Sequence, residues 1–292
     1  MRRSTLVAIA AIAVIAFGSV VVPAIGARSP TAIGDVIGGR LLAPFSRDPS
    51  GVLHLLGTDR LGRDLLARSL LAGRTSLAVG IGGALLAGAL GVCIGSLAGW
   101  WRGPLDRVLM AVTDALLAIP RLVLLLLCVA LWEPGLQTVV IVLAATGWMG
   151  IARLTRAEVI AARGRPYVDA ARALGAHSRR TLWRHVLPNA LGPALVATAM
   201  GVGSAIMLEA GLSFLGLGVQ PPAASWGNMI AAGRDVVVSA PWVSLVPGIA
   251  VVIVTMCATI LGDAARDRIA GRRAPSAQRI RIVTMSRGPA VN

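Results

Sequence analysis

The stretch Thr75-Ser-Leu-Ala-Val-Gly-Ile-Gly-Gly-Ala-Leu-Leu-Ala-Gly-Ala-Leu-Gly-Val-Cys-Ile-Gly-Ser-Leu-Ala-Gly99 decides the fold class of this chain. Its 25 residues carry no charge, and about 20 mostly apolar residues are enough for an α-helix to cross the apolar core of a bilayer. In lipid, a helix satisfies its backbone hydrogen bonds within itself, which an isolated strand cannot do. The stretch therefore predicts a membrane-spanning helix.

Small residues recur every four positions along this stretch. Residues four apart lie on one side of a helix, so they form a stripe that lets a second backbone approach closely. A helix of the same chain and a helix of a second subunit both fit such a stripe, and the sequence leaves the two open. The members of the stripe are Gly83, Ala87, Gly91, Gly95 and Gly99.

The composition of the whole chain agrees with a lipid environment. Hydrophobic residues make up 56% and charged residues 14%, and the mean hydropathy is +0.77, which argues against a water-soluble domain of 292 residues. The formal net charge of +15 raises nucleic acid as an alternative partner. However, the arginines lie in short segments between apolar runs, and aromatic residues make up only 4%. This distribution favours loops on the anionic, cytoplasmic face of a membrane.

Six apolar stretches predict an all-α membrane protein with about six transmembrane helices. We interpret residues 1–26 as an uncleaved anchor, because the apolar run is longer than that of a usual signal peptide. A secretory signal peptide is the alternative, since Ala24-Ile25-Gly26 resembles a cleavage site. Residues 27–72 are expected to form an extracytoplasmic loop with a short helix. The other spans are expected within a core of residues 73–267, at about Thr75–Gly99, Leu105–Leu131, Leu136–Leu154, Asn189–Leu208 and Val243–Leu261.

The arginines predict the orientation. Alternate loops place Arg102, Arg107 and the eight arginines from Arg153 to Arg184 on one side, together with the basic tail of residues 268–292. The positive-inside rule makes that side cytoplasmic. Both termini are then expected in the cytoplasm, with the tail disordered at its end.

Three ionisable residues fall inside predicted spans, and such residues are candidates for a transport pathway. Asp114 and Arg121 are seven residues apart, which places them on one face of a continuous helix, with Pro120 between them loosening the backbone. The structural alternative is that Asp114, near the cytoplasmic end, pairs with a loop arginine. Glu209 is the third candidate, near the outer end of the fifth span.

The polar connector of residues 155–188 predicts two short helices. Pro166 suits a first helical turn, and Gly175 suits the end of that helix. A second helix is expected to be capped by Ser178 and to stop at Pro188, where Asn189 would cap the fifth span. The first helix has a small apolar face that fits either a groove in a partner protein or the lipid headgroups. That face is formed by Tyr167, Ala170, Ala171 and Leu174.

The same connector carries a family motif. Asp169-Ala-Ala, then Gly175, then His185-Val-Leu-Pro188 resembles the EAA motif of ABC importer permeases, although Asp169 stands where Glu is usual. His185 departs from the broad consensus and is common in the peptide branch. The resemblance implies that this connector seats in an ATPase subunit and favours the docking alternative. The coupling residues it implies are Tyr167, Asp169, Ala170, Ala171, Gly175, Ala176, His185 and Pro188.

Two more segments resemble the dipeptide and oligopeptide branch of the DppC/OppC type. One runs from Gly57-Thr-Asp-Arg-Leu-Gly-Arg-Asp64 to Leu77, and the other from Glu209 to Gly233, with Leu212-Ser-Phe-Leu-Gly-Leu-Gly218 at its centre. Ala224 and Thr259 depart from the residues usual in the branch. Since the likeness extends from about Gly57 to Asp267, it covers most of the chain.

The resemblance implies a type I permease in a bacterial inner membrane. Its implied partners are a homologous second permease, two cytoplasmic ATPases and an external substrate-binding protein. ATP and Mg would be bound by the ATPases, because this chain has no Gly-x-x-x-x-Gly-Lys-[Ser/Thr] loop, and no catalytic or metal-ligating residues are expected in it. Dipeptides or oligopeptides are the expected cargo, with nickel or another small solute as the alternative. An ion-driven carrier or an intramembrane enzyme would need features that the sequence does not show.

Overall fold

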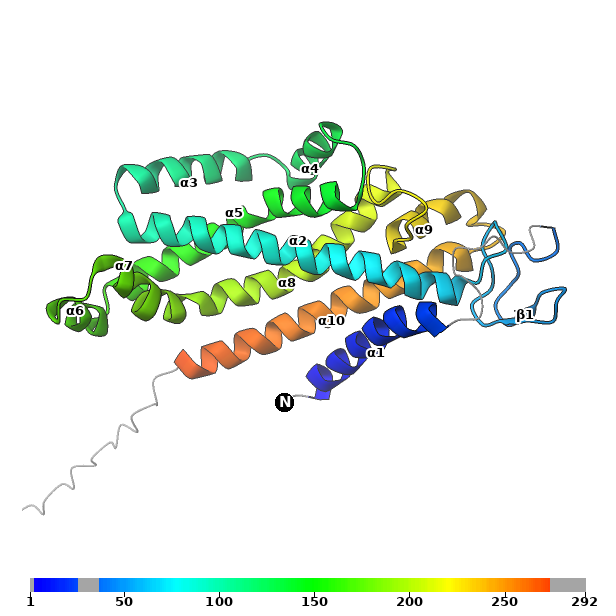
Figure 1. Ribbon diagram of the computed structural model, residues 1–292, viewed down its shortest axis with the longest axis horizontal. Coiled ribbons are helices and arrows are strands. Elements are labelled where there is room, and N and C mark those ends of the chain that lie inside the picture. Colours follow the sequence, from blue (N-terminus) through cyan, green and yellow to red (C-terminus); the bar gives the residue numbers. More distant parts are fainter. Residues whose placement is uncertain (1–2, 26–36, 274–292) are drawn as a thin grey trace, which may run out of the picture.

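The structure is a computed structural model that describes residues 3–25 and 37–273, and it is almost entirely helical (Figure 1). Two short strands, β1 (Ser46–Arg47) and β2 (Leu53–His54), pair antiparallel. The helices are α1 (Arg3–Ile25), α2 (Leu65–Trp101), α3 (Pro104–Leu117), α4 (Arg121–Ala130), α5 (Leu136–Arg163), α6 (Pro166–Ala173), α7 (Ser178–Thr181), α8 (Leu187–Phe214), α9 (Trp226–Gly233) and α10 (Trp242–Arg273).

Within the described residues, five helical segments are long and apolar enough to cross a membrane. They belong to α1, α2, α5, the continuous α7–α8 helix and α10, and the bent pair α3–α4 brings the number to six if it is one span. The prediction of an all-α membrane protein with about six spans is therefore confirmed. Only residues 268–273 of the expected C-terminal tail are described, and they continue α10.

The third predicted span is not a continuous helix. α3 and α4 are bent by 93° at the break before Arg121. Pro120 explains the break, because proline has no amide hydrogen for a helix interior and its ring clashes with the preceding turn. The expectation that Asp114 and Arg121 share one helical face is therefore wrong, since they lie in differently directed helices.

α2 runs through the centre of the molecule and packs along α5, with α8 on another side (Figure 1). The small-residue stripe lies on the α5 side. A Cβ added at Gly91 would lie 2.7 Å from both the Trp148 carbonyl oxygen and the Ile151 Cβ. Added Cβ atoms at Gly95 and Gly99 would likewise meet the α5 backbone. Of the two alternatives for the stripe, the structure shows packing within this chain.

The second span begins ten residues before its predicted start. Asp64 caps α2, because its side chain accepts a hydrogen bond of 2.9 Å from the Ala67 amide. Residues 37–64 form turns and the β1–β2 pair rather than a helix. The remainder of the expected extracytoplasmic segment, residues 27–36, lies outside the described residues.

The end of the connector also differs from its prediction. α7 passes through a π-helical turn, Leu182–Val186, directly into α8, so the helix does not stop at Pro188. In the wider turn the Leu187 amide donates to the Leu182 carbonyl five residues back, and such a turn accommodates a following proline that has no amide hydrogen. Asn189 consequently lies inside the helix rather than at its cap. The cap of α7 is His177, not Ser178, and it makes no side-chain capping bond.

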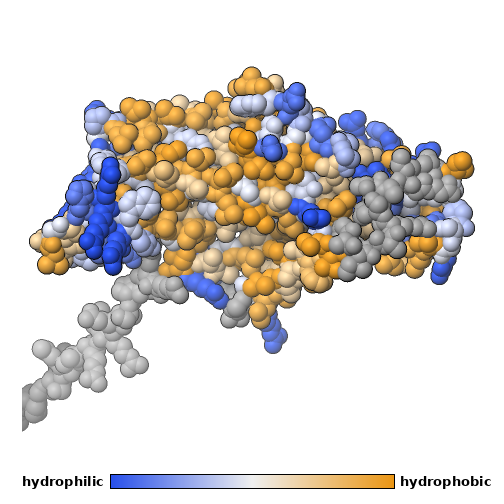
Figure 2. All heavy atoms as spheres, viewed as in Figure 1, coloured by the Kyte–Doolittle hydropathy of each residue, from blue (hydrophilic) through white to orange (hydrophobic). Residues whose placement is uncertain are grey.

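The two ends of the helix bundle differ. The β1–β2 pair and α9 lie at one end, and α6 and α7 lie at the other (Figure 1). α1 begins and α10 ends on the side toward α6 (Figure 1). Figure 2 shows hydrophobic side chains over the middle of the molecule and hydrophilic ones gathered around α6 and α7. This arrangement is typical of a bundle set in a bilayer.

Replacing the central stripe glycine with alanine is expected to destabilise the chain. In Gly91→Ala the new methyl would overlap the Trp148 carbonyl oxygen, and overpacking of this kind costs about 1–3 kcal/mol. The matched control is Gly82→Ala, whose Cβ would meet only Val140 at 3.7 Å and which gains up to about 1 kcal/mol of helix propensity. Thermal unfolding of the two purified variants in detergent checks this. Equal melting temperatures would contradict the observed α2–α5 packing.

Candidate functional site

The connector between α5 and α8 forms a compact projection at one end of the bundle. α6 ends in a Schellman motif, in which the Gly175 amide donates to the Arg172 carbonyl at 2.9 Å and the Ala176 amide donates to the Ala171 carbonyl at 3.0 Å. Gly175 has φ +79°, a conformation that disfavours side chains. The prediction that Gly175 ends the first helix is confirmed.

The inner side of α6 is fixed in a small hydrophobic core. Val168 is fully buried and belongs to a cluster with Val159 of α5, Leu182 of the π-helical turn and Ala190 of α8. Trp100, at the end of α2, is 4% exposed and completes this cluster. The projection is therefore attached to three of the long helices at once.

Trp100 makes two hydrogen bonds and two cation–π contacts with residues of α5, α6 and α7. Its indole N–H donates to the Ser178 hydroxyl at 3.0 Å, and its carbonyl accepts from Arg163 at 2.7 Å. The guanidinium carbons of Arg163 and Arg172 lie 5.5 and 5.4 Å from the centroid of its ring, within cation–π range. These contacts hold the start and end of α6 against the end of α2.

The outer side of α6 is exposed and partly apolar. Tyr167 is 37% exposed and Leu174 is 89% exposed, while Ala170 between them is also exposed. Asp169 faces solvent with Arg172 at 3.5 Å, where such an ion pair contributes little to stability. The predicted apolar face is thus present on the surface, and a large apolar side chain as open as Leu174 suits contact with another molecule.

The remaining predicted coupling residues take different places. Ala171 and Ala176 are half-buried at the end of α6. His185 is half-buried in the π-helical turn, and its carbonyl accepts from the Asn189 side chain at 2.8 Å. Pro188 is exposed at the start of α8. The structure brings these residues onto one projection, and their role in coupling stays a prediction.

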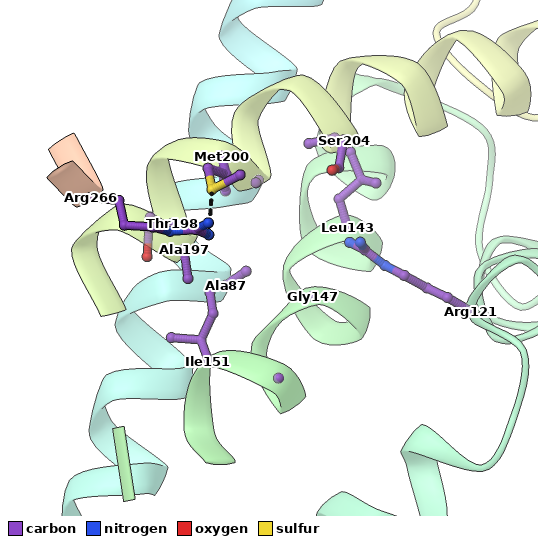
Figure 3. Close-up of a pocket in the computed structure, with 15 residues that line it drawn as sticks. Ala87, Arg121, Leu143, Gly147, Ile151, Ala197, Thr198, Met200, Ser204 and Arg266 are labelled. Atoms are coloured by element: carbon purple, nitrogen blue, oxygen red, sulfur yellow. Dashed lines mark hydrogen bonds between the residues drawn. The ribbon is translucent and has the colours of Figure 1, made fainter. Parts of the chain in front are cut away.

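A cavity of about 360 Å³ lies in the bundle, between α2, α5 and α8 (Figure 3). Gly83, Gly147 and Gly201 line it near the midpoints of these three helices. Two of them also lie at the α2–α5 contact, because a Cβ added at Gly83 would lie 3.1 Å from the Leu143 Cβ and one added at Gly147 would lie 3.0 Å from the Ala87 Cβ. Arg121 of α4 and Arg266 of α10 supply the charged lining, which includes no acidic residue.

The three predicted pathway residues lie apart. Arg121 lines the cavity, whereas Asp114 lies outside its lining. Asp114 instead has Arg153 at 3.7 Å, both of them exposed. It therefore pairs with an arginine as the structural alternative proposed, but that arginine belongs to the helix α5 and not to a loop. Glu209 is fully buried in a separate network.

The Glu209 network joins three elements. The carboxylate accepts hydrogen bonds from the hydroxyls of Ser76 of α2 at 3.2 Å and Ser213 of α8 at 2.7 Å. Ser76 also accepts from the Trp226 amide at 3.1 Å, at the start of α9. The Trp226 indole N–H donates to the Ser69 carbonyl at 2.9 Å. Every one of these contacts is internal, so Glu209 ties α9 onto α2 and α8 rather than facing the cavity.

Sequence reasoning missed Trp100 as the anchor of the connector. Trp100 and Trp101 both fall at the end of a span, where tryptophans are expected at the membrane interface. In the structure, Trp100 is buried whereas Trp101 is 45% exposed, so only Trp100 belongs to the core that holds the connector. The arginines and Ser178 that contact Trp100 are more than sixty residues away in the sequence, so no local signal could have shown the cluster.

The structure combines membrane-spanning helices that line a cavity with an exposed projection at one end. A family model described as "Binding-protein-dependent transport system inner membrane component" matches residues 91–274. The chain belongs to this family. It is therefore a multi-pass inner-membrane component of a transport system.

Several characterised or named proteins are similar in sequence. A protein of Brucella suis that carries the provisional name of peptide transport system permease is 44% identical over 219 residues, covering 75% of this chain and 74% of that protein. The oligopeptide transport system permease OppC of Bacillus subtilis is 38% identical, covering 74% and 71%. The glutathione transport system permease GsiD of Pectobacterium atrosepticum is 38% identical, covering 74% and 72%.

Solved structures support the fold. The MetNI methionine ABC transporter in an inward-facing conformation matches with a TM-score of 0.57 at 20% identity, covering 69% of this chain and 96% of the solved chain. An amino acid ABC transporter matches with a TM-score of 0.54 at 18% identity, covering 69% and 94%. At this identity, the likeness concerns the ABC importer permease fold and not the substrate.

Loss of the Trp100 side chain is expected to loosen α6 without unfolding the bundle. Trp100→Leu removes the indole hydrogen bond and both cation–π contacts, together worth about 2 kcal/mol. Amide hydrogen exchange in α6 should then become about 30-fold faster. The matched control is Trp101→Leu, which removes an exposed side chain from the neighbouring position. Unchanged exchange in the Trp100 variant would show that the anchor lies elsewhere.

Proposed function

We propose that this chain is one permease of an ATP-driven ABC importer that carries peptides into the cell. The names of the sequence relatives, which are peptide, oligopeptide and glutathione transport permeases, support a peptide as the cargo. A homologous second permease would complete the pathway, an external binding protein would deliver the peptide, and two separate ATPase subunits would bind ATP and Mg. This chain would itself hold no cofactor.

The main support for the proposal is the projection at α6, which is exposed on its outer side and packed against the long helices on its inner side. Its outer side presents an exposed apolar residue, Leu174, and small side chains that allow close approach. Its inner side is fixed to α2, α5 and α8 through Trp100 and Val168. A protein that binds the outer side of α6 and displaces it would therefore also displace α2, α5 and α8, which line the cavity.

The energy required for such movement is modest. Shifting a two-state equilibrium from 1:99 to 99:1 takes about 5.5 kcal/mol of differential binding. ATP-driven closure of an ATPase dimer around two such projections can supply that bias. The α6 end would then be cytoplasmic, in agreement with the arginines of the connector and the positive-inside rule.

Placing a charge on the outer side of α6 is expected to separate the ATPase from the permease. Leu174→Asp changes a side chain that is 89% exposed, so the fold of the chain should persist. Loss of a central interface contact costs more than about 1.4 kcal/mol, or tenfold in affinity. Co-purification of the ATPase and ATP-dependent peptide uptake should both fall at least about tenfold.

The control is Val238→Asp, which changes a similarly exposed apolar residue in the segment between α9 and α10, away from α6. This variant should retain the ATPase. Gly175→Arg should also abolish uptake, but it strains a backbone with φ +79° and so alters the projection as well as its surface. ATPase bound at normal stoichiometry by Leu174→Asp would refute the docking surface.

A further inference from the structure

We propose that Arg121 is a substrate-binding residue, which receives the carboxylate of a peptide in the cavity at the middle of the bundle. This inference rests on the proposed function and adds a recognition step within the membrane. It assigns a specific chemical contact to a chain whose cargo would otherwise be selected outside the membrane, by the binding protein.

The depth of the cavity makes the arginine unusual. The lining glycines Gly83, Gly147 and Gly201 lie near the midpoints of three membrane-spanning helices. A charged side chain at that depth is costly if it faces lipid, so it normally faces water or a partner. Arg121 reaches the cavity because the chain turns by 93° just before it and α4 begins there.

The Arg121 guanidinium lies between residues of α5 and α8. Figure 3 shows the Arg121 side chain extending toward Leu143 and Gly147 of α5, with Ser204 of α8 on the same side of the cavity. A Cβ added at Gly147 would lie 3.0 Å from Nη2 of Arg121. Glycine at this position lets the guanidinium lie close to α5, and a Cβ there would meet both Arg121 and the Ala87 Cβ at 3.0 Å.

The charge of Arg121 is not balanced within the described part of the chain. No carboxylate there forms an ion pair with it, and none lines the cavity. The second lining arginine, Arg266, has Asp263 on its own helix at 3.9 Å and the Met200 sulfur at 3.4 Å. Arg121 thus leaves its planar set of donors directed at the cavity, which is a geometry that binds a carboxylate with two parallel hydrogen bonds.

A peptide is the carboxylate source that fits best. The volume of about 360 Å³ lies at the lower end of the range for small-molecule sites. Apart from the two arginines, Thr198 and Ser204, the lining consists of glycine and apolar residues, most of them small, which place few specific demands on the side chains of a peptide. Such a site would recognise what all peptides share, the C-terminal carboxylate, and tolerate what differs between them. An acidic residue of the second permease and an anionic lipid headgroup are the other groups that could meet Arg121.

The test uses the complete transporter, with both permeases and its ATPases, in lipid nanodiscs without nucleotide. The probe is a tripeptide with a C-terminal benzoylphenylalanine, prepared as the free acid and as the carboxamide, and photolabelled segments are identified by mass spectrometry. In the wild type, the acid should label residues 143–151 or 197–205 at least about fivefold more than the carboxamide. Arg121→Gln should abolish this preference and Arg121→Lys should retain part of it.

Arg107→Gln is the matched control, because Arg107 is an exposed arginine of α3 that does not line the cavity. It should keep the full preference for the acid. Equal labelling by acid and carboxamide, no labelling of either segment, or a preference that survives Arg121→Gln would overturn the inference. Loss of the second permease from the Arg121→Gln complex would assign the arginine to that subunit instead and would also overturn it.

Two further experiments distinguish a lipid ligand of Arg121 from a peptide, and failure of this inference from failure of the proposed function. Nanodiscs of zwitterionic lipid are compared with nanodiscs that contain anionic lipid, and loss of the acid preference only in the second would assign Arg121 to a headgroup, against the inference. Uptake driven by ATP and the binding protein is measured with the wild-type complex. No uptake would count against the proposed function, whereas normal uptake without acid preference would count against the role of Arg121 alone.

Discussion

The close approach of α2 to α5 is the constraint on which the rest of the structure depends. Between helices in lipid there is no hydrophobic driving force, so van der Waals contact between backbones has to hold them together. Gly91, Gly95 and Gly99 permit that contact by omitting side chains along one side of α2. With α2 and α5 fixed as a pair, α8 and the other helices have a framework to pack against.

The α2–α5 pair also connects the two candidate functional regions, the α6 projection and the cavity. One end of the pair carries Trp100 and Val159, which hold α6, and its middle carries Gly83 and Gly147, which line the cavity. Tightly packed helices move as units and not by gradual deformation. A displacement of α6 should therefore reach the cavity wall through the helices themselves, without a separate relay.

The sequence predicted the features that depend on local patterns. Apolar length predicted the spans, and Gly175 with Pro166 predicted the bounds of α6, because these signals act within a few residues. The break at Pro120 was recognised only as a weakening, since the sequence does not show which way a chain turns when a helix ends. The continuation through Pro188 was missed because it requires a π-helical turn. The Trp100 cluster and the cavity depend on contacts between distant segments, which periodicity cannot reveal.

Glu209 and Arg121 both belong to predicted membrane spans, but their surroundings differ, because the chain supplies hydrogen-bond partners to the first and no carboxylate partner to the second. Glu209 is enclosed and accepts hydrogen bonds from Ser76 and Ser213, so its carboxylate already has partners and serves to join helices. Arg121 is exposed on the open cavity that it lines, and no carboxylate of the described residues pairs with it or lines that cavity. A charged side chain at membrane depth is tolerated where it faces water or a partner rather than lipid, so Arg121 is available to groups that enter the cavity. That difference in surroundings, rather than the presence of a charge, is why we propose Arg121, and not Glu209, as a residue of the pathway.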